Sequence, residues 1–251
     1  MILSKSKLKT YSMKQEITKH FRRFEVKYLI PENYADKIIP SVLENMEWDE
    51  YAKEEQYYKC YSLYTDGPGL NSYKAVINGD LFRKKLRFRL YDKNGEFGFL
   101  EIKRKKHGVI IKDRERLSVD DFKGFLKDPM SLKVQNWDKD FIEEAIAWHW
   151  ENKLEANVWV GCKRKPFTHS LNSQFRVTFD YDLVFSEIEA DGYSSINEQK
   201  KYEKKVIMEA KFIEKMPLWF KNIIDIYKLE SSGFSKYCTG IETLNLQQKN
   251  V

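Results

Sequence analysis

Charged and apolar residues alternate along several short segments of the chain, a pattern typical of β-strands. Side chains two residues apart share one strand face, so Glu25 and Lys27 lie on one face and Val26 and Tyr28 on the other. With its turn signals, this alternation predicts about eight strands. They cover residues 21–30, 57–65, 84–92, 96–105, 109–118, 155–164, 174–182 and 204–212.

Other segments carry apolar residues at helical spacing. Ile38, Val42 and Met46 fall on one stripe, which indicates a helix that packs against the core. Pro217 suits the first turn of a helix, where its missing N–H costs nothing. The predicted helices cover residues 32–47, 70–77, 119–127, 137–151 and 217–228, and tight turns are expected at Asn94-Gly95 and Lys106-His107-Gly108.

The composition indicates a folded chain of 251 residues, with 42% hydrophobic and 33% charged positions. No shift in composition marks a boundary. We therefore expect one domain over residues 21–245, preceded by a flexible basic lead-in at residues 1–20. The net charge of +6 favours anionic partners but does not by itself separate nucleotides, nucleic acids and membrane surfaces.

The three cysteines, Cys60, Cys162 and Cys238, are few, odd in number and far apart. Such spacing predicts neither a disulfide framework nor a zinc site, and it favours a reducing compartment. No stretch reaches the roughly 20 apolar residues that span a bilayer. No apolar core of a secretory signal is present either. A cytoplasmic protein without a membrane segment is the expectation.

The charged strand faces carry more basic residues than solubility requires. Lys85, Arg87 and Arg89 share one face, opposite Leu86 and Phe88. Pattern alone favours the ordinary interpretation, a sandwich with its charged faces in water. The alternative is an inverted barrel, in which the charged faces line the interior and the apolar faces pack against helices; eight strands can enclose one small ligand.

Three observations favour the inverted barrel. Like charges on neighbouring strands repel, so a bound anion would compensate them. Glu-x-Lys occurs three times on strands, and carboxylates beside lysines could hold a divalent cation and the phosphates that it bridges. The apolar helices also need a partner surface. The Glu-x-Lys pairs are Glu25/Lys27, Glu101/Lys103 and Glu209/Lys211.

Such a face suits phosphoryl transfer, which needs positioning and charge neutralisation more than a covalent nucleophile. Mn²⁺ or Mg²⁺ would be the cofactor, because both prefer oxygen ligands and often take few protein carboxylates. The sequence has no Walker-A, dinucleotide-binding, zinc-protease or nucleophile-elbow motif. Its aromatic residues alternate opposite the charges instead of sharing their face, which argues against a nucleic-acid partner.

At these strands the chain resembles the VTC-domain polyphosphate polymerases, a branch of the triphosphate tunnel metalloenzymes. The matching pieces follow the family's order. They are RFEVKY (23–28), SLYTD (62–66), KLRFRLY (85–91), FLEIKRK (99–105), IIKDRERLS (110–118), CKRKPF (162–167), FRVTFD (175–180), VIMEAKF (206–212) and GFSKY (233–237). The resemblance implies an α+β fold with an eight-stranded antiparallel β-barrel tunnel, a charged interior and surrounding helices.

The resemblance also implies roles for the charged residues. Glu209 matches the family's metal-binding glutamate, and Glu25 and Glu101 are further tunnel acids assigned to the metal. The residues expected to act on the phosphates in catalysis are Lys27, Arg87, Arg89, Lys103, Arg164 and Arg176. The residues expected to bind substrate are Lys112 and Lys236, together with Lys85, Arg114 and Lys211 from the charged strand faces.

The implied reaction moves the γ-phosphoryl group of ATP onto a polyphosphate chain, with pyrophosphate or a short polyphosphate as primer. The related CYTH triphosphatases open with Glu-x-Glu-x-Lys, whereas this chain has Arg23 in place of the first glutamate, which favours the polymerase branch. Gly233 stands where a second basic residue can occur. A tunnel triphosphatase and a non-catalytic polyanion-binding module are the alternatives.

Overall fold

The computed structural model describes residues 23–92, 95–107, 109–132, 138–169, 175–189, 200–203 and 205–248. The predicted lead-in at residues 1–20 lies outside these ranges, as do residues 21 and 22 of the predicted domain. Asn94 and Gly108 of the two predicted turns also lie outside them.

The strands of the described chain form one antiparallel sheet of ten strands in the order β1-β10-β8-β7-β3-β4-β5-β6, with β2 paired to β7 and β9 to β8. The bounds are β1 (Arg23–Pro31), β2 (Glu47–Trp48), β3 (Tyr58–Asp66), β4 (Phe82–Leu90), β5 (Phe97–Lys106), β6 (Val109–Ser118), β7 (Glu155–Thr168), β8 (Arg176–Ser186), β9 (Lys200–Lys201) and β10 (Lys205–Ile213). The long strands confirm the predicted ones to within a few residues, whereas the two-residue strands β2 and β9 were not predicted.

The helices of the described residues follow the predicted segments, with one addition. They are α2 (Glu32–Leu43), α3 (Asn71–Ile77), α4 (Val119–Lys127), α5 (Lys139–Asn152), α6 (Leu218–Ile226) and α7 (Lys236–Thr243), with short 3₁₀ turns at Glu50–Ala52, Pro129–Ser131 and Leu246–Gln248. Helix α2 ends before residue 47 because Glu47 and Trp48 pair with β7 instead. Across the described ranges, no helix is both long and apolar enough to cross a membrane.

A closed barrel is not confirmed. Strands β1 and β6 are the two ends of the sheet, and no ladder of hydrogen bonds joins them in the described part of the chain. The sheet nevertheless curls, because Cα atoms of β1 and β6 come within 8 Å of each other. The architecture is therefore α+β, with a curled open sheet in place of the predicted eight-stranded barrel.

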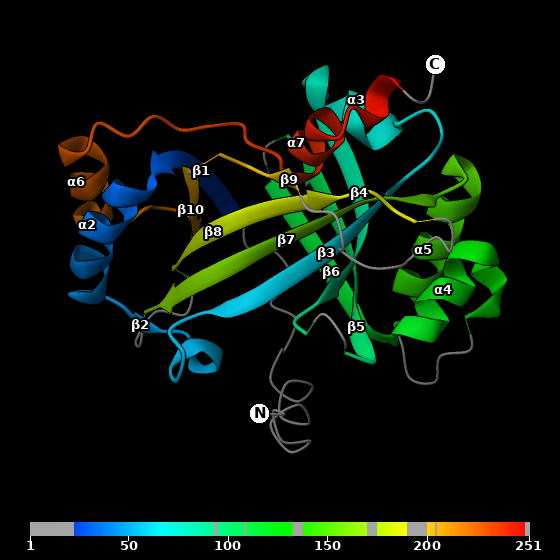
Figure 1. Cartoon of the computed structure of the whole chain (residues 1–251), viewed down its shortest axis with the longest axis horizontal. Coiled ribbons are helices and arrows are strands. Elements are labelled where there is room, and N and C mark those ends of the chain that lie inside the picture. The colour runs from blue at the N-terminus through cyan, green and yellow to red at the C-terminus, as the bar shows by residue number, and fades with distance from the viewer. Residues whose placement is uncertain are drawn as a thin grey trace.

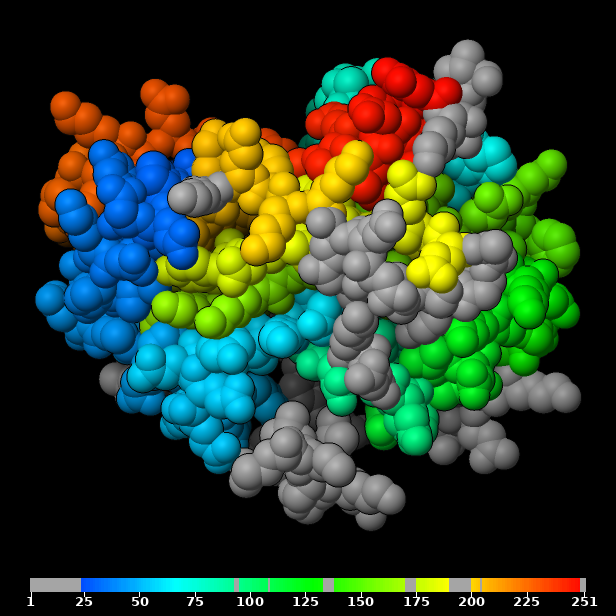
Figure 2. All heavy atoms as spheres, viewed as in Figure 1, coloured from blue at the N-terminus to red at the C-terminus, as the bar shows by residue number. Residues whose placement is uncertain are grey.

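Two helix pairs cover the apolar side of the sheet, one pair at each end of the molecule (Figures 1 and 2). Helices α2 and α6 pack on β1, β8 and β10, where Ile38 and Phe220 meet Phe179. Helices α4 and α5 pack on β4 and β5, where Phe122 stacks on Phe88 with ring centroids 4.4 Å apart. This apolar packing sends the other face of each long strand toward the inside of the curl.

Helix α7 lies on that inner face, and it was not predicted from the sequence. Ser235 caps the helix by accepting a hydrogen bond from the Cys238 backbone N–H. Gly240 lets the helix approach the sheet, since a Cβ there would lie 3.0 Å from a ring carbon of Phe185. The helix has only eight residues and contains Gly240, a residue of low helix propensity, which explains why the sequence did not predict it.

Asp66 fixes α3 and α7 to the end of β3. Its carboxylate is fully buried and accepts backbone N–H bonds from Gly67, Ser72 and Tyr73 at 2.9 to 3.1 Å. It also accepts a bond from the Tyr237 hydroxyl at 2.7 Å. One carboxylate thus holds the start of α3 and the first turn of α7.

Replacement of this carboxylate tests its structural role. Asp66→Ala leaves four buried donors without their acceptor, so the free energy of unfolding should fall by roughly 3 kcal/mol or more. Urea denaturation followed by circular dichroism measures the change. Asp225→Ala, on the exposed side of α6, should change it by less than about 0.5 kcal/mol. Equal stability of the two variants would contradict the anchoring role.

Candidate functional site

The predicted charged residues share the inner face of the curled sheet. In the β1–β10 ladder Lys27 lies opposite Glu209 and Glu25 opposite Lys211, and directly opposed residues of an antiparallel pair point to the same side. The β4–β5 ladder likewise opposes Arg87 to Glu101. The inverted arrangement expected from the sequence is thus present in an open sheet, with apolar faces outward under the helices.

Contacts between strands near opposite ends of the open sheet show that its curl brings their charged side chains together. Lys103 of β5 donates to both carboxylate oxygens of Glu25 on β1 at 2.9 Å, although the two strands lie near opposite ends of the sheet. The segment before α7 bridges the same space. Lys27 Nζ donates to the Phe234 carbonyl at 3.1 Å, and Lys85 Nζ donates to Ser235 Oγ at 2.9 Å.

Glu101 forms ion pairs with basic residues of β4 and β6. Its side chain is fully buried, and it accepts hydrogen bonds from Arg87 Nε at 2.6 Å and from Lys112 Nζ. Arg89 Nε lies 3.6 Å from the same carboxylate. Burial raises the pKa of Glu101, but Arg87, Lys112 and Arg89 outweigh burial and hold that pKa well below its usual range. Glu101 is therefore ionised and lies within ion-pair distance of three basic side chains.

Asp180 likewise forms ion pairs with basic residues of β7 and α7. It was not among the site residues predicted from the sequence. Arg164 donates to its two carboxylate oxygens at 2.6 and 2.8 Å, and Lys236 donates to one of them. The residue is fully buried. The available signal was its position two residues from Thr178, on the charged side of the strand.

Glu25 and Glu209 form a carboxylate pair on adjacent strands. Burial and the neighbouring Glu209 raise the pKa of Glu25, yet Lys27, Lys103 and Lys211 outweigh them and lower the pKa to about 2. Burial likewise raises the pKa of Glu209, and Lys211 and Lys27 outweigh burial and hold that pKa well below its usual range. Both groups are therefore ionised oxygen donors on one side of the sheet.

This pair of carboxylates could bind a hard divalent cation whose remaining ligands come from the phosphates of the substrate. Within the described ranges, no group of three or more acidic, histidine or cysteine side chains could bind a metal without other ligands. Mg²⁺ and Mn²⁺ do not need such a group, because one or two carboxylates with phosphate oxygens and waters suffice. Glu25 and Glu209 match that requirement. Glu101, also predicted as a metal ligand, is instead enclosed by Arg87, Arg89 and Lys112.

Three buried lysines on the face bind their protons weakly. Burial lowers the pKa of Lys112 the most, to about 7, against the opposing effect of Glu101. Burial lowers the pKa of Lys85 to about 8, and the neighbouring charges of Lys27 and Lys103 contribute to that lowering. Burial also lowers the pKa of Lys103 to about 8, against the opposing effect of Glu25. The face therefore carries cations that the present carboxylates do not fully stabilise.

Among the described residues, two polar atoms on the inner face lack a hydrogen-bond partner, although one of them, Arg89 Nε, lies within ion-pair distance of Glu101. The Nε atom of Arg89 and the Oγ1 atom of Thr178 are buried, and neither has a hydrogen-bond partner in the part of the chain that the structure describes. Buried polar groups without partners are rare in folded proteins. A ligand with several oxygen atoms would supply partners for the Arg89 donor and the Thr178 hydroxyl.

Three predicted site residues lie at the edges of the face. Arg176 pairs with Asp49 at 2.6 Å, and its side chain is half exposed. Arg114 lies over the Phe99 ring, 4.9 Å from its centroid. Lys211 pairs with Glu209 at 2.6 Å and remains partly exposed. These residues are outside the buried centre, whereas Lys27, Arg87, Arg89, Lys103 and Arg164 meet within it.

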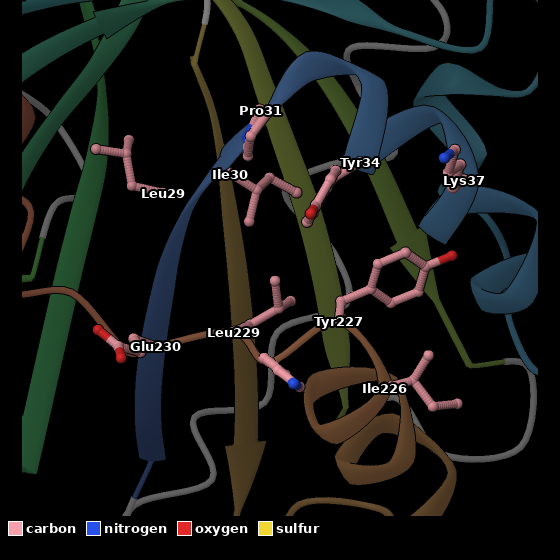
Figure 3. Close-up of a pocket in the computed structure, with 10 residues that line it drawn as sticks. Leu29, Ile30, Pro31, Tyr34, Lys37, Ile226, Tyr227, Leu229 and Glu230 are labelled. Atoms are coloured by element: carbon pink, nitrogen blue, oxygen red, sulfur yellow. The ribbon is translucent and has the colours of Figure 1, made fainter.

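A separate surface groove lies between the end of β1, the start of α2 and the segment after α6 (Figure 3). Its volume is about 580 Å³, and Tyr34 and Tyr227 form part of its wall. Its ionisable lining residues besides these tyrosines are Lys37, Lys228 and Glu230. With a single carboxylate and mostly apolar walls, this groove does not match the charge required of a polyphosphate site.

Two solved structures are similar to this chain at low sequence identity. Among solved structures, the chain is similar to a Bacillus halodurans protein described as a candidate adenylate cyclase. The two share 12% identity over 85% of this chain and 95% of that one, with a TM-score of 0.49. A Pyrococcus horikoshii protein shares 14% identity over 88% of this chain and 99% of that one, with a TM-score of 0.45. No curated protein sequence matches.

The family comparison covers almost the whole domain predicted from the sequence. The model of the VTC domain matches residues 22–245, which include every strand and helix that contributes to the charged face. The chain belongs to the VTC domain family.

Proposed function

We propose that this chain is a metal-dependent polyphosphate polymerase that transfers the γ-phosphoryl group of ATP to the end of a polyphosphate chain. The observation that carries the proposal is the buried inner face, on which lysines and arginines outnumber carboxylates. Membership of the VTC domain family supports a phosphoryl-handling enzyme. The missing first glutamate of the triphosphatase motif, replaced by Arg23, favours the polymerase over hydrolysis.

In this proposal the arginines align the two substrates. Arg87, Arg89 and Arg164 present rigid forks that match phosphate oxygens, and Glu101 and Asp180 hold these forks in place. A terminal phosphate oxygen of the acceptor attacks the γ-phosphorus. The bond between that phosphorus and the bridging oxygen breaks, and ADP leaves. The surrounding positive charge reduces repulsion between two polyanions and stabilises the transition state.

Glu25 and Glu209 would hold the divalent cation. When bound, the cation supplies neutralisation of the charge that develops on the phosphate oxygens. Lys27, Lys103 and Lys211 surround the two carboxylates and keep them ionised at neutral pH. These lysines are also within reach of phosphate groups that the cation would bridge.

The products of ATP turnover test the proposed activity. Purified protein incubated with ATP, Mn²⁺ and a pyrophosphate primer should release ADP while a ladder of lengthening polyphosphate appears on a gel. Release of ADP with orthophosphate and no polymer would replace the polymerase by a triphosphatase. Tight binding of polyphosphate without turnover would identify a non-catalytic binding module and end the proposal.

Removal of one proposed metal-binding carboxylate tests the metal site. Glu209→Gln keeps the size of the side chain but removes a hard anionic ligand. Turnover should fall by on the order of a hundredfold, because charge neutralisation by a metal contributes several kcal/mol to transition-state stabilisation. Initial rates of ADP release across a Mn²⁺ titration measure the effect.

Glu44→Gln, at the exposed end of α2, is the matched control and should retain full activity. A urea midpoint for Glu209→Gln close to the parent value would show that the fold survives. Full activity of the folded Glu209→Gln variant at saturating Mn²⁺ would remove Glu209 from the metal site.

The lowered pKa of Lys85 generates a pH prediction. In the free protein this lysine loses its proton around pH 8, and a phosphate chain beside it favours the charged form. ATP binding at about pH 8 should therefore take up protons, since the phosphates are already ionised there with a second pKa of about 6. Affinity should fall as the pH rises from about 7 to about 9.

Titration calorimetry in two buffers of different ionisation enthalpy measures this proton uptake, in the absence of metal. Lys85→Met should reduce the uptake, with the remainder from Lys103 and Lys112. Lys59→Met, an exposed lysine on the other side of β3, should leave it unchanged. Identical uptake in all three proteins would show that Lys85 does not face the bound phosphates.

A further inference from the structure

Two cysteines that are far apart in the sequence lie side by side in the sheet. Cys60 on β3 and Cys162 on β7 are directly opposed in the antiparallel ladder. Opposed residues in such ladders have Cα atoms about 4.5 to 5.5 Å apart, a range that falls inside the window for a disulfide bond. Both are free thiols, and both are buried. The sequence alone gave no sign of this pairing.

The two thiols lie where the charged centre meets the apolar cluster under α7, to which both belong together with Val160 and Tyr237. Two residues along the strands lie Arg164 and Tyr58 on one side of the pair and Val160 and Ser62 on the other, and Arg164 is bound to Asp180. Lys236 Nζ lies 3.9 Å from Cys162 Sγ. The pair is therefore in contact with the cations that surround Asp180.

This environment distinguishes the two sulfur atoms. The hydrogen bond from Cys162 and the cations Arg89, Arg164 and Lys236 outweigh burial and hold the pKa of Cys60 well below its usual range. The pKa of Cys162 is held well above its usual range by that same hydrogen bond and by burial. Cys60 is therefore the more easily ionised of the two thiols and the expected nucleophile.

We propose that Cys60 and Cys162 form an oxidative modification site, at which hydrogen peroxide converts the opposed thiols into a cross-strand disulfide. The Cys60 thiolate attacks one peroxide oxygen, the O–O bond breaks, and the sulfenic acid forms with release of hydroxide. The Cys162 sulfur then attacks the Cys60 sulfur and loses its proton, and water leaves. Two electrons pass from the sulfur atoms to one peroxide molecule.

Oxidation would also change the charge of the inner face, a consequence that rests on the proposed function. The strand register places Arg89 on β4 and Arg164 on β7 diagonally across from Cys60, so the ionised form of this thiol is a counter-charge for both, whereas the disulfide is neutral. Those cations then lack one counter-charge, so a polyanion should bind more tightly to the oxidised protein than to the reduced protein. The pair would thus couple the redox state to the affinity of the face for phosphates.

Thiol counting on the intact chain tests the modification site directly. The reduced protein is treated with dilute hydrogen peroxide, freed of peroxide, alkylated with N-ethylmaleimide under denaturing conditions and weighed by mass spectrometry. Untreated protein should carry three labels, one for each cysteine, and oxidised protein should carry one, on Cys238. Peptide mapping should find Cys60 linked to Cys162.

Single-cysteine variants separate the pair from the third thiol. Cys238→Ser should form the same disulfide, whereas Cys60→Ser and Cys162→Ser should not. Three labels after peroxide treatment, sulfinic or sulfonic acid without a disulfide, or a disulfide that includes Cys238 would each overturn the proposal. The parent protein and Cys238→Ser suffice for this decision if the other variants do not fold.

The coupling has its own readout. Calorimetric titration of oxidised and reduced Cys238→Ser with ATP should give severalfold tighter binding to the oxidised form. Equal affinities for a protein with a mapped Cys60–Cys162 disulfide would overturn the coupling alone. Because the labelling experiment uses no nucleotide, failure of the disulfide is distinct from failure of the polymerase proposal.

Discussion

The structure depends on the balance of charge on one buried face. Two like unit charges about 4 Å apart repel by about 4 kcal/mol at an effective dielectric constant near 20, so a bare cluster of lysines and arginines would oppose folding. Glu25, Glu101, Asp180 and Glu209 offset this repulsion. The first three each contact at least two basic residues, and Glu209 pairs with Lys211. The carboxylates reduce the excess of positive charge without removing it. What remains is suited to a ligand that carries several negative charges.

The outer packing makes this face possible. Apolar strand residues such as Phe88 and Phe179 are covered by the two helix pairs, so the sheet buries its hydrophobic side outward and turns its charged side inward. Helix α7 then bridges the inner side, where Lys236 joins Asp180, and Asp66 holds the helix through Tyr237. The outer helices bury one side of the sheet. The inner side combines the ion pairs with an apolar cluster under α7 that includes Val158, Phe185 and Ile241.

Much of this arrangement followed from residue alternation. Alternation predicted which residues share a strand face, and the density of basic residues and the family resemblance favoured an interior for Lys27, Arg87, Arg89 and Lys103. The contact from Lys103 on β5 to Glu25 on β1 and the ladder registers confirm the shared interior. The pattern did not determine closure, because whether β1 and β6 pair depends on curvature that no short segment encodes. Helix α7 was missed because it is short and contains Gly240, which has low helix propensity. Asp180 and the pairing of Cys60 with Cys162 depend on register between strands that are distant in sequence.

A structure of the protein with tripolyphosphate and Mn²⁺ would show whether the charged inner face binds phosphates. We expect phosphate density on the inner face, in contact with Arg87, Arg89 and Arg164. We also expect an anomalous manganese peak between the phosphates and the carboxylates of Glu25 and Glu209. Phosphate bound only on the outer surface, with the ion pairs of Glu101 and Asp180 intact around a face that admits no anion, would contradict this expectation.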